Sequence, residues 1–373
     1  MNVPRLLLIG FQSPLSDDIY PPLRSFMDEV GARAELEYFH FRERGLFIQG
    51  VVAAPRDPRA YRYAARALFS SFVDTLALHR SPDAYDAVIA IDQYAYAAAA
   101  VALRQPNLVL WSLDIVARDH RLFGNPVLRV TRQLAMVGLR QHTRVIIQDR
   151  DRLGVLADSY GIDAASLDAF FMPVFLSSTE AVPGRLPDDG RLVLMQCGGI
   201  GAYRLSDRLL HHYQGHANEY QLWLHGYLVG PDIRTGLDEC RVHPAVSWKT
   251  VAPAELPQLI DQCDVGFVGY GTGDLNHRHM VNCSGQMLEF LRMGKPVIVS
   301  GSASLGAFVE AQGIGAYVAD VSLLGSALRR VAQDYTAYSR RALDCFKKRF
   351  SAERNVLRLI EWLDPPNHAT RLR

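Results

Sequence analysis

The chain has few cysteines and none of them in a closely spaced pair. Five cysteines occur in 373 residues, and this odd number without paired spacing favours a reducing compartment over a disulfide framework. A Cys-x-x-Cys pair and a cluster of His and Cys are both absent from the sequence. We therefore expect no structural zinc site.

Long apolar runs and a charge excess of one sign are also missing. The apolar run at residues 5–10 is too short to span a membrane and has no cleavage site after it, so we expect no signal peptide. A formal net charge of +1 gives no overall attraction to nucleic acid, and no nucleic-acid partner is expected. These absences predict a cytoplasmic protein, either soluble or attached to the inner face of the membrane.

The composition, with 49% hydrophobic and 21% charged residues, is that of a folded globular protein with room for two domains. Strand-like apolar segments alternate with helical segments in both halves, which predicts parallel βαβ units and an α/β fold. The expected strands lie at 6–9, 34–38, 87–91, 107–111, 145–148, 192–196, 220–224, 265–268 and 297–299, and the expected helices include 21–30, 58–79 and 351–363. The turn-rich segment 177–190 is the expected linker.

One segment, residues 284–300, combines a helix, a glycine stop and a buried strand. Apolar residues recur at helical spacing before Gly294, which ends the helix, and an apolar strand follows at 297–299. Such a unit places Glu289 and the helix N-terminus at the carboxyl edge of a parallel sheet, where α/β folds bind ligands. A helix N-terminus favours anions and a carboxylate favours hydroxyl groups, and a sugar nucleotide offers both.

This segment also resembles a known family. Residues 286–297, Gln-Met-Leu-Glu-Phe-Leu-Arg-Met-Gly-Lys-Pro-Val, resemble the donor signature Lys-Leu-Leu-Glu-Tyr-Leu-Ala-x-Gly-Lys-Pro-Val of GT-B glycosyltransferases with a group 1/family 4-like donor domain. The resemblance covers residues 190–364 best. It departs at Val281, where retaining members often have a second glutamate, and at Gln286, where a lysine is frequent. Asn282 or Ser284 is a candidate for the polar role of that glutamate.

The resemblance implies two Rossmann-like domains that face each other across a cleft. The first, 1–178, would bind the acceptor, the second, 179–350, the nucleotide-diphosphate sugar, and the C-terminal helix in 351–373 would pack back on the first. It implies metal-independent glycosyl transfer without a cofactor, from a UDP or GDP sugar to a glycan or lipid-linked acceptor, as in surface polysaccharide synthesis. A sugar-nucleotide epimerase or hydrolase of the same fold is an alternative.

A non-catalytic nucleotide-sugar-binding protein is the second alternative, and the departures at Val281 and Gln286 favour it. A nicotinamide dehydrogenase is disfavoured, because the glycines at 198–201 lack the Gly-x-Gly-x-x-Gly spacing of dinucleotide-binding turns.

Glycines follow the strand expected at 192–196. They predict a tight turn whose N–H groups approach an anion, while Arg204 or Arg208 would neutralise a leaving diphosphate. The alternative, purely structural interpretations are a turn with solvated arginines after the strand, a helix cap at Ser284 and an exposed helix charge at Glu289. The predicted donor-binding residues are Gly198, Gly199, Gly201, Tyr203, His225, Tyr270, Ser284, Gly285, Gln286 and Glu289.

In the first half, Asp92 and Asp114 each follow an expected strand. An inverting transferase needs a group that takes the acceptor hydroxyl's proton, so these two carboxylates are predicted catalytic residues. Arg204, which would neutralise the leaving diphosphate, is the third predicted catalytic residue. Competing candidates on nearby loops are Asp17, Asp18 and His120. A helix cap or an ion pair is the alternative role for each carboxylate.

Two other patterns are open to simpler interpretations. Asp149-Arg-Asp151 matches a metal-binding Asp-x-Asp, but it opens an expected helix, and the pair His277 and His279 lacks a third ligand; no metal site is predicted. Basic residues on helical faces predict peripheral membrane contact or a grip on a lipid diphosphate, with solvated faces as the alternative. These residues are Arg59, Arg62 and Arg66 in one group and Arg129, Arg132 and Arg140 in the other.

Overall fold

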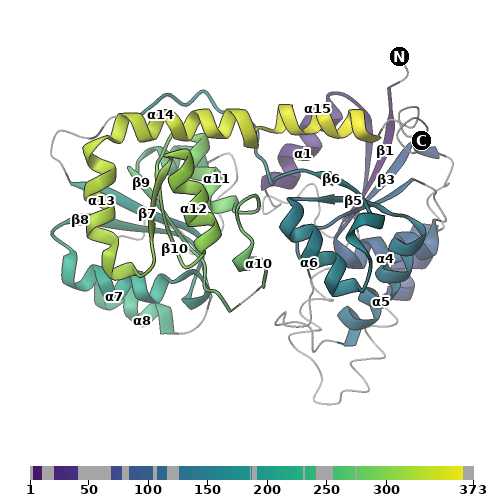
Figure 1. The fold of residues 1–373 in the computed structure, drawn as a ribbon, viewed down its shortest axis with the longest axis horizontal. Helices are drawn as coiled ribbons and strands as arrows, with labels where there is room; N and C mark the ends of the chain where they lie inside the picture. The colour runs from purple at the N-terminus through teal and green to yellow at the C-terminus, as the bar shows by residue number, and fades with distance from the viewer. Residues whose placement is uncertain are drawn as a thin grey trace. The chain divides into compact units, whose positions relative to one another are not determined.

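The chain forms two parallel sheets in two compact units (Figure 1). The computed structural model describes residues 3–10, 21–40, 69–77, 84–103, 107–115, 126–184, 186, 191–229, 232–240, 255–273 and 275–363. Unit 1 comprises Met1–Pro173 and Asn355–Arg373, and unit 2 comprises Val174–Arg354. The expected α/β fold with two Rossmann-like sheets is confirmed.

Unit 1 has a six-stranded parallel sheet in the order β2-β1-β3-β4-β5-β6. Its strands are β1 (Arg5–Gly10), β2 (Glu35–His40), β3 (Ala87–Ile91), β4 (Leu108–Trp111), β5 (Arg144–Ile147) and β6 (Asp168–Phe171). Its helices are α1 (Pro21–Gly31), α4 (Asp92–Ala102), α5 (Pro126–Gln141), α6 (Arg150–Tyr160) and η2 (Ala164–Ser166), and residues 69–77 are also helical. β6 was not predicted, because its sequence Asp-Ala-Phe-Phe begins with a charged residue and has only Phe170 buried, so it lacks the apolar run of the other short strands.

The last helix, α15 (Ala352–Leu363), joins unit 1 from Asn355 onward. The Trp362 ring stacks on Phe170 at 5.3 Å between centroids, and the Arg144 guanidinium lies 4.0 Å from the centre of the Trp362 ring. Arg144 also donates a hydrogen bond to the Trp362 carbonyl (2.6 Å), and the indole N–H donates to Asp168 (3.3 Å). The end of α15 is therefore tied to β5 and β6.

Unit 2 has a five-stranded parallel sheet in the order β11-β10-β9-β7-β8. Its strands are β7 (Leu192–Ile200), β8 (Tyr220–Leu228), β9 (Val265–Gly269), β10 (Val297–Ser300) and β11 (Gly315–Val318). Its helices are η3 (Ala202–Arg204), α7 (Ser206–His216), α8 (Asp232–Cys240), α9 (Leu256–Asp261), α10 (Leu275–Arg278), α11 (Gly285–Arg292), α12 (Ala303–Gln312), η4 (Val321–Leu323), α13 (Leu324–Gln333), α14 (Tyr335–Cys345) and the π-helical η5 (Phe346–Phe350).

The inner strands β9 and β10 of unit 2 are buried along their whole length, as is usual for strands of a parallel sheet that is covered on both faces. Leu194, Leu222 and Phe267 pack with the apolar sides of α7, α8 and α13 in one core cluster. On the opposite face, Phe290 of α11 lies so close to Gly266 of β9 that no side chain would fit there. Figure 1 shows α7 and α8 side by side on the first face. The sheet is thus the middle of three layers.

The strand order fixes where a ligand site is expected in each unit. In chain order the unit 2 sheet reads 2-1-3-4-5, so the direction of winding reverses between β7 and β9. In unit 1 the corresponding reversal lies between β1 and β3. Ligands of open α/β sheets bind outside the carboxyl ends of the strands at such a reversal.

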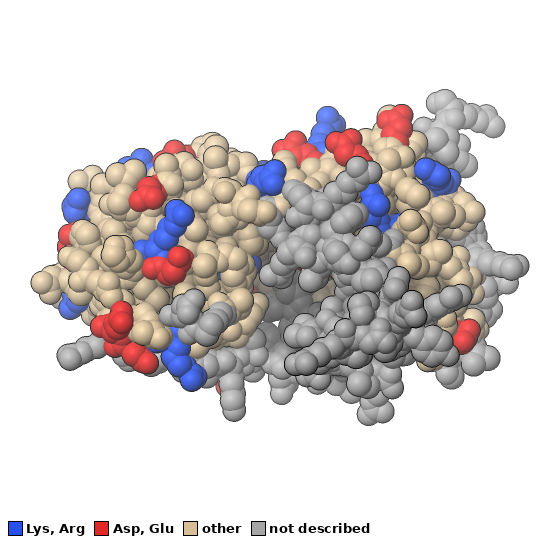
Figure 2. Space-filling model, turned by 90° about the horizontal axis from the view of Figure 1, so that it is seen from below, with Lys and Arg blue, Asp and Glu red and all other residues tan. Residues whose placement is uncertain are grey.

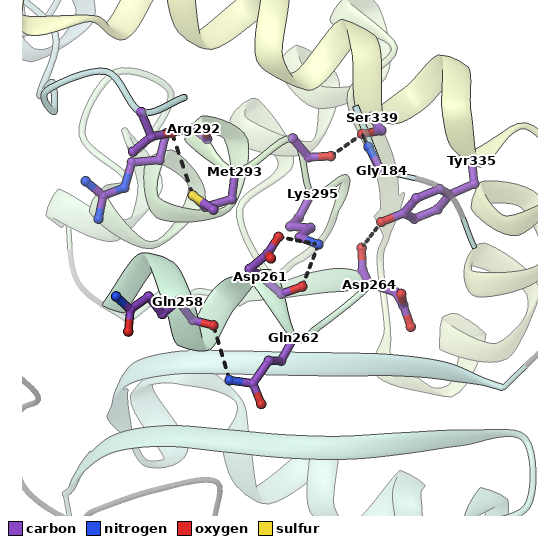
Figure 3. Close-up of polar contacts among 12 residues, drawn as sticks. Gly184, Gln258, Asp261, Gln262, Asp264, Arg292, Met293, Lys295, Tyr335 and Ser339 are labelled. Atoms are coloured by element: carbon purple, nitrogen blue, oxygen red, sulfur yellow. Dashed lines mark hydrogen bonds and ion pairs between the residues drawn. The ribbon is translucent and has the colours of Figure 1, made fainter. Parts of the chain in front are cut away.

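The segment that enters unit 2 is bonded to it from its first residue. The Val174 N–H donates to the Asn282 carbonyl (2.8 Å), and the Gly184 N–H donates to Ser339 Oγ (2.7 Å). Ser339 in turn donates to the Gly294 carbonyl (2.6 Å), and Figure 3 shows Ser339 beside Gly184. The described part of the predicted linker 177–190 therefore belongs to unit 2, and the chain crosses between units before it.

Surface charge is mixed on the face seen in Figure 2, where the described basic and acidic residues are interspersed. Within the described ranges, the helices are all too short or too polar to cross a membrane.

Candidate functional site

Two loops meet at the reversal between β7 and β9. The Gly271 N–H, after β9, donates to the Tyr203 carbonyl (2.9 Å), after β7. Gln196 Nε2 donates to the Arg204 carbonyl (2.9 Å), and the Arg204 guanidinium lies 4.3 Å from the centre of the Tyr270 ring. The predicted residues Tyr203, Arg204 and Tyr270 are thus brought together at the edge where a ligand is expected.

The N-terminus of α11 adjoins this group. The Tyr270 hydroxyl and Ser284 Oγ are 2.8 Å apart, and Ser284 Oγ accepts the Met287 N–H (3.2 Å) as the helix cap. Gly285, a predicted donor-binding residue, donates its N–H to the Cys283 carbonyl (3.0 Å). What remains at this point is the positive end of the helix dipole beside the Arg204 guanidinium, an arrangement that favours an anion.

Glu289 is buried one turn further along α11, with 6% of its surface exposed. The alternative of an exposed helix charge is therefore wrong. Its carboxylate forms an ion pair with Arg292, which is also buried. Burial raises the pKa of Glu289 to about 7, against the lowering effect of Arg292. Glu289 is thus a carboxylate whose charge changes near neutral pH.

The glycine segment differs from its prediction. β7 extends to Ile200, so Gly198 and Gly199 lie in the strand and not in a turn. Gly198 and its register partner Gly226 in β8 both have positive φ angles (95° and 137°), and a Cβ at Gly226 would overlap the Gly198 carbonyl. Gly201 does lie in the turn, but its N–H donates to Ser206 Oγ (3.0 Å). These glycines permit close backbone approach instead of forming an anion cradle.

Gln286 and His225 lie around Cys197 of β7. Gln286 Nε2 donates to the Cys197 carbonyl. His225 is the register partner of Cys197, so both side chains are on one face of the sheet. β8 continues to Leu228, so His225 is inside the strand and not at its end, and burial lowers its pKa.

Several buried polar atoms around Cys197 have no hydrogen-bond partner among the described residues. They are Nε and Nη1 of Arg204, Nδ1 of His225, Oε1 of Gln286 and Nε of Arg292. Cys197 interacts electrostatically with Glu289, Arg204 and Arg292, and burial is the main reason that its pKa is raised. Because buried polar atoms are nearly always satisfied in folded proteins, this concentration marks the binding place of a polar ligand or of water.

In unit 1, Asp92 and Asp114 lie together at the carboxyl ends of β3 and β4. Asp92 begins α4 with a left-handed backbone (φ 59°), and its Oδ1 accepts the N–H groups of Leu113 (2.8 Å) and Asp114 (3.1 Å). Burial and the Asp114 charge raise the pKa of Asp92 to about 7, although these hydrogen bonds and Arg152 lower it. Asp92 therefore has the proton affinity of a general base near neutral pH.

Three other sequence patterns have structural roles. Asp149 caps α6 by accepting the Arg152 N–H (3.0 Å), as the capping interpretation predicted. Asn282, considered for the role of the missing glutamate, accepts from Arg349 Nε (3.2 Å) and Nη2 (3.0 Å). His277 Nδ1 is 3.1 Å from the Gly271 carbonyl. Among the residues that the structure describes, no group of three or more His, Cys, Asp or Glu side chains could hold a metal.

Other predicted residues do not join the site or cannot be placed. Arg208 is exposed on α7 and interacts with Asp320. Arg132 lies over the Tyr160 ring of α6 at 5.4 Å, whereas Arg140 is exposed. Asp17, Asp18, His120, Arg59, Arg62 and Arg66 lie outside the described residues, as does the side chain of Arg129.

The sequence analysis missed Arg292. The sequence does indicate this residue, because a glutamate followed by an arginine three residues later on a helix predicts that the two side chains pair. Cys197 was also missed as the point around which the site is arranged; a single buried cysteine has no pattern by which it could have been found.

Comparison with known proteins finds no matching family and no matching curated protein. Solved structures do match. Anabaena HepE in complex with UDP is 16% identical, with a TM-score of 0.66 over 96% of this chain and 99% of HepE. Thermosynechococcus elongatus sucrose-phosphate synthase is 14% identical, with a TM-score of 0.70 over 96% and 98% of the two chains. WaaG, a glycosyltransferase involved in lipopolysaccharide biosynthesis, is 10% identical, with a TM-score of 0.60 over 96% and 100%. The chain therefore has the GT-B fold of two Rossmann-like units that these structures share.

Proposed function

We propose that this chain is a glycosyltransferase that moves a sugar from a nucleoside-diphosphate donor to an acceptor hydroxyl. The main support is the group of residues at the β7–β9 reversal. There, the positive end of α11 and the incompletely bonded guanidinium of Arg204 lie close to the buried carboxylate of Glu289. An anion-binding end and a hydroxyl-binding end match a diphosphate and a ribose.

In this proposal Arg204 and the α11 N-terminus hold the diphosphate, and Glu289 accepts hydrogen bonds from the ribose hydroxyls. When the bond between sugar and phosphate breaks, negative charge grows on the leaving diphosphate. A fixed guanidinium and a helix dipole stabilise this charge more in the transition state than in the bound donor, which is what accelerates the reaction. Asp92 of unit 1 is the proposed proton acceptor for the attacking hydroxyl.

A UDP sugar is the proposed donor, because HepE, of the same fold, was crystallised with UDP and with UDP-glucose. We propose a glycan or lipid-linked acceptor, and WaaG, with its role in lipopolysaccharide biosynthesis, supports a place in surface polysaccharide synthesis. Val130, Val137 and Arg140 are all exposed on α5, so we retain this helix as a proposed peripheral membrane contact.

Binding is tested first, by thermal unfolding with UDP, GDP, dTDP, CMP, ADP and NAD. A ligand at a hundred times its dissociation constant that binds only the folded chain adds about 2.7 kcal/mol to the free energy of unfolding. We expect UDP to stabilise the wild type and not Glu289→Ala. Glu310→Ala is the matched control, because Glu310 is an exposed glutamate of the same unit paired with Arg330. A folded protein that no nucleotide stabilises would contradict the proposal.

Turnover then separates a transferase from its alternatives. A transferase consumes UDP-sugar much faster when an acceptor is present, whereas an epimerase or hydrolase needs no acceptor. Tight binding with no turnover under any acceptor would identify a non-catalytic binding protein.

A further inference from the structure

Arg292 is unusual for its place. It stands where the family signature has an alanine, and only 8% of its surface is exposed. Its partner Glu289, three residues earlier on the same helix, is equally buried, and the two form an ion pair. Burying an arginine costs free energy unless an opposite charge compensates it, so we expect Arg292 to have a role other than packing.

The helix direction puts Arg292 behind Glu289 as seen from the ligand edge. α11 begins at the carboxyl edge of the sheet and ends at Arg292, just before the start of β10 at the amino edge. The Arg292 carbonyl accepts Thr179 Oγ1 (2.9 Å), and Met293 beside it closes the helix (Figure 3). Arg292 is therefore further from the diphosphate position than Glu289 is.

We propose that Arg292 is a positioning residue for donor binding, which holds the Glu289 carboxylate ionised and oriented for the ribose hydroxyls without touching the donor. This inference rests on the proposed function. The Arg292 guanidinium forms an ion pair with Oε2 of Glu289, and both side chains are buried. Close packing limits the rotamers that two buried side chains can adopt, so the Glu289 carboxylate has a restricted orientation toward a ligand.

The charge argument gives the same result. Burial raises the pKa of Glu289, and Arg292 is the group that lowers it. From a neighbouring element, the Cys197 thiol of β7 faces Glu289, and Arg204 and Arg292 both act on that thiol. Without Arg292, Glu289 takes up a proton at a higher pH, and its acid form offers the ribose hydroxyls fewer acceptor sites.

The test is the affinity for UDP by calorimetry from pH 6 to pH 9, in the wild type, Arg292→Met and Arg292→Lys. UDP affinity of the wild type should fall as the pH falls through the pKa of Glu289, about 7. In Arg292→Met the midpoint of this fall should move up by about 1 pH unit or more, and Arg292→Lys should restore most of it. An unchanged midpoint in Arg292→Met overturns the proposal.

A double variant provides a second test in case Arg292→Met does not fold. Glu289→Gln/Arg292→Met removes both charges together, which costs much less than leaving one of them buried and alone. If Arg292 acts only through Glu289, this double variant and Glu289→Gln should bind UDP within about twofold of each other at every pH. A tenfold weaker double variant would mean that Arg292 contacts the donor itself, contrary to the proposal.

Lys295→Met is the matched control. Lys295 is a buried cation at the same end of α11, paired with Asp261, so its loss should lower stability and leave the pH midpoint unchanged. The two proposals fail differently. A wild type that binds none of the nucleoside diphosphates refutes the transferase proposal, whereas a wild type that binds UDP with a midpoint independent of Arg292 refutes only this inference.

Discussion

Replacing Arg204 with methionine should weaken UDP binding without lowering the free energy of unfolding. The guanidinium lies over Tyr270 at 4.3 Å and near Tyr203 at 5.3 Å, yet its Nε and Nη1 have no hydrogen-bond partner among the described residues. The arginine therefore has aromatic contacts that stabilise it and two buried donors that lack a hydrogen bond.

The two contributions oppose each other in the free energy of unfolding. Two cation–π contacts stabilise by about 1–2 kcal/mol together. The two buried donors without a partner cost about 1–3 kcal/mol each, so their total cost equals or exceeds what the contacts contribute. Methionine keeps much of the side-chain volume and needs no hydrogen bond, so Arg204→Met should leave the free energy of unfolding unchanged or raise it by a few kcal/mol. The effect on UDP is not balanced: two charge-assisted hydrogen bonds, about 1.5–3 kcal/mol each, weaken binding by at least a hundredfold when lost.

The assay pairs urea unfolding with UDP calorimetry on Arg204→Met, Arg204→Lys and the control Arg208→Met. Arg208 is exposed on the adjoining helix, so its loss should change neither quantity. Lysine should recover part of the affinity, because it keeps the charge but not the planar pair of donors. If Arg204→Met lost more than about 3 kcal/mol of stability, or kept wild-type affinity for UDP, the reasoning would be refuted.

Three further predictions concern a base, a helix and a strand. Asp92→Asn should abolish transfer while UDP binding persists. Wild-type activity should rise as the pH rises through about 7, since only the ionised form of Asp92 accepts a proton. Asn tolerates the left-handed backbone at this position, so circular dichroism should show a folded variant. Trp362→Ala should lower the free energy of unfolding of unit 1 by about 3–5 kcal/mol in urea, against less than about 0.5 kcal/mol for the exposed Leu357→Ala. Gly226→Ala should lower the melting temperature sharply, because its Cβ would overlap the Gly198 carbonyl, whereas Gly215→Ala on the open side of α7 should raise it slightly. Equal melting temperatures for these two variants would contradict the close approach of β7 and β8.

The strands show what local patterning can predict. The segment 87–91 was predicted with its observed ends, because an apolar run buried on both faces has a clear signal. β7 and β8 were each predicted four residues too short, since Gly198, Gly199 and Gly226 are typical of turns in sequence. Only the pairing of the two strands, in which the glycines face one another, shows that they continue.

The sequence by itself determined the α/β class, the helix that carries Glu289 and the grouping of Tyr203, Arg204, Tyr270 and Ser284 at one edge, because these follow from periodicity and from the ends of parallel strands. Tertiary structure alone decided how those groups are used. The bonds of Gly201 and Gly285 to other partners, the burial of Glu289 and its pairing with Arg292 depend on which atoms come within bonding distance, and on how much water is excluded around them. Charge and hydrogen bonding act over a few ångströms in space, whereas sequence patterns describe only neighbours along the chain.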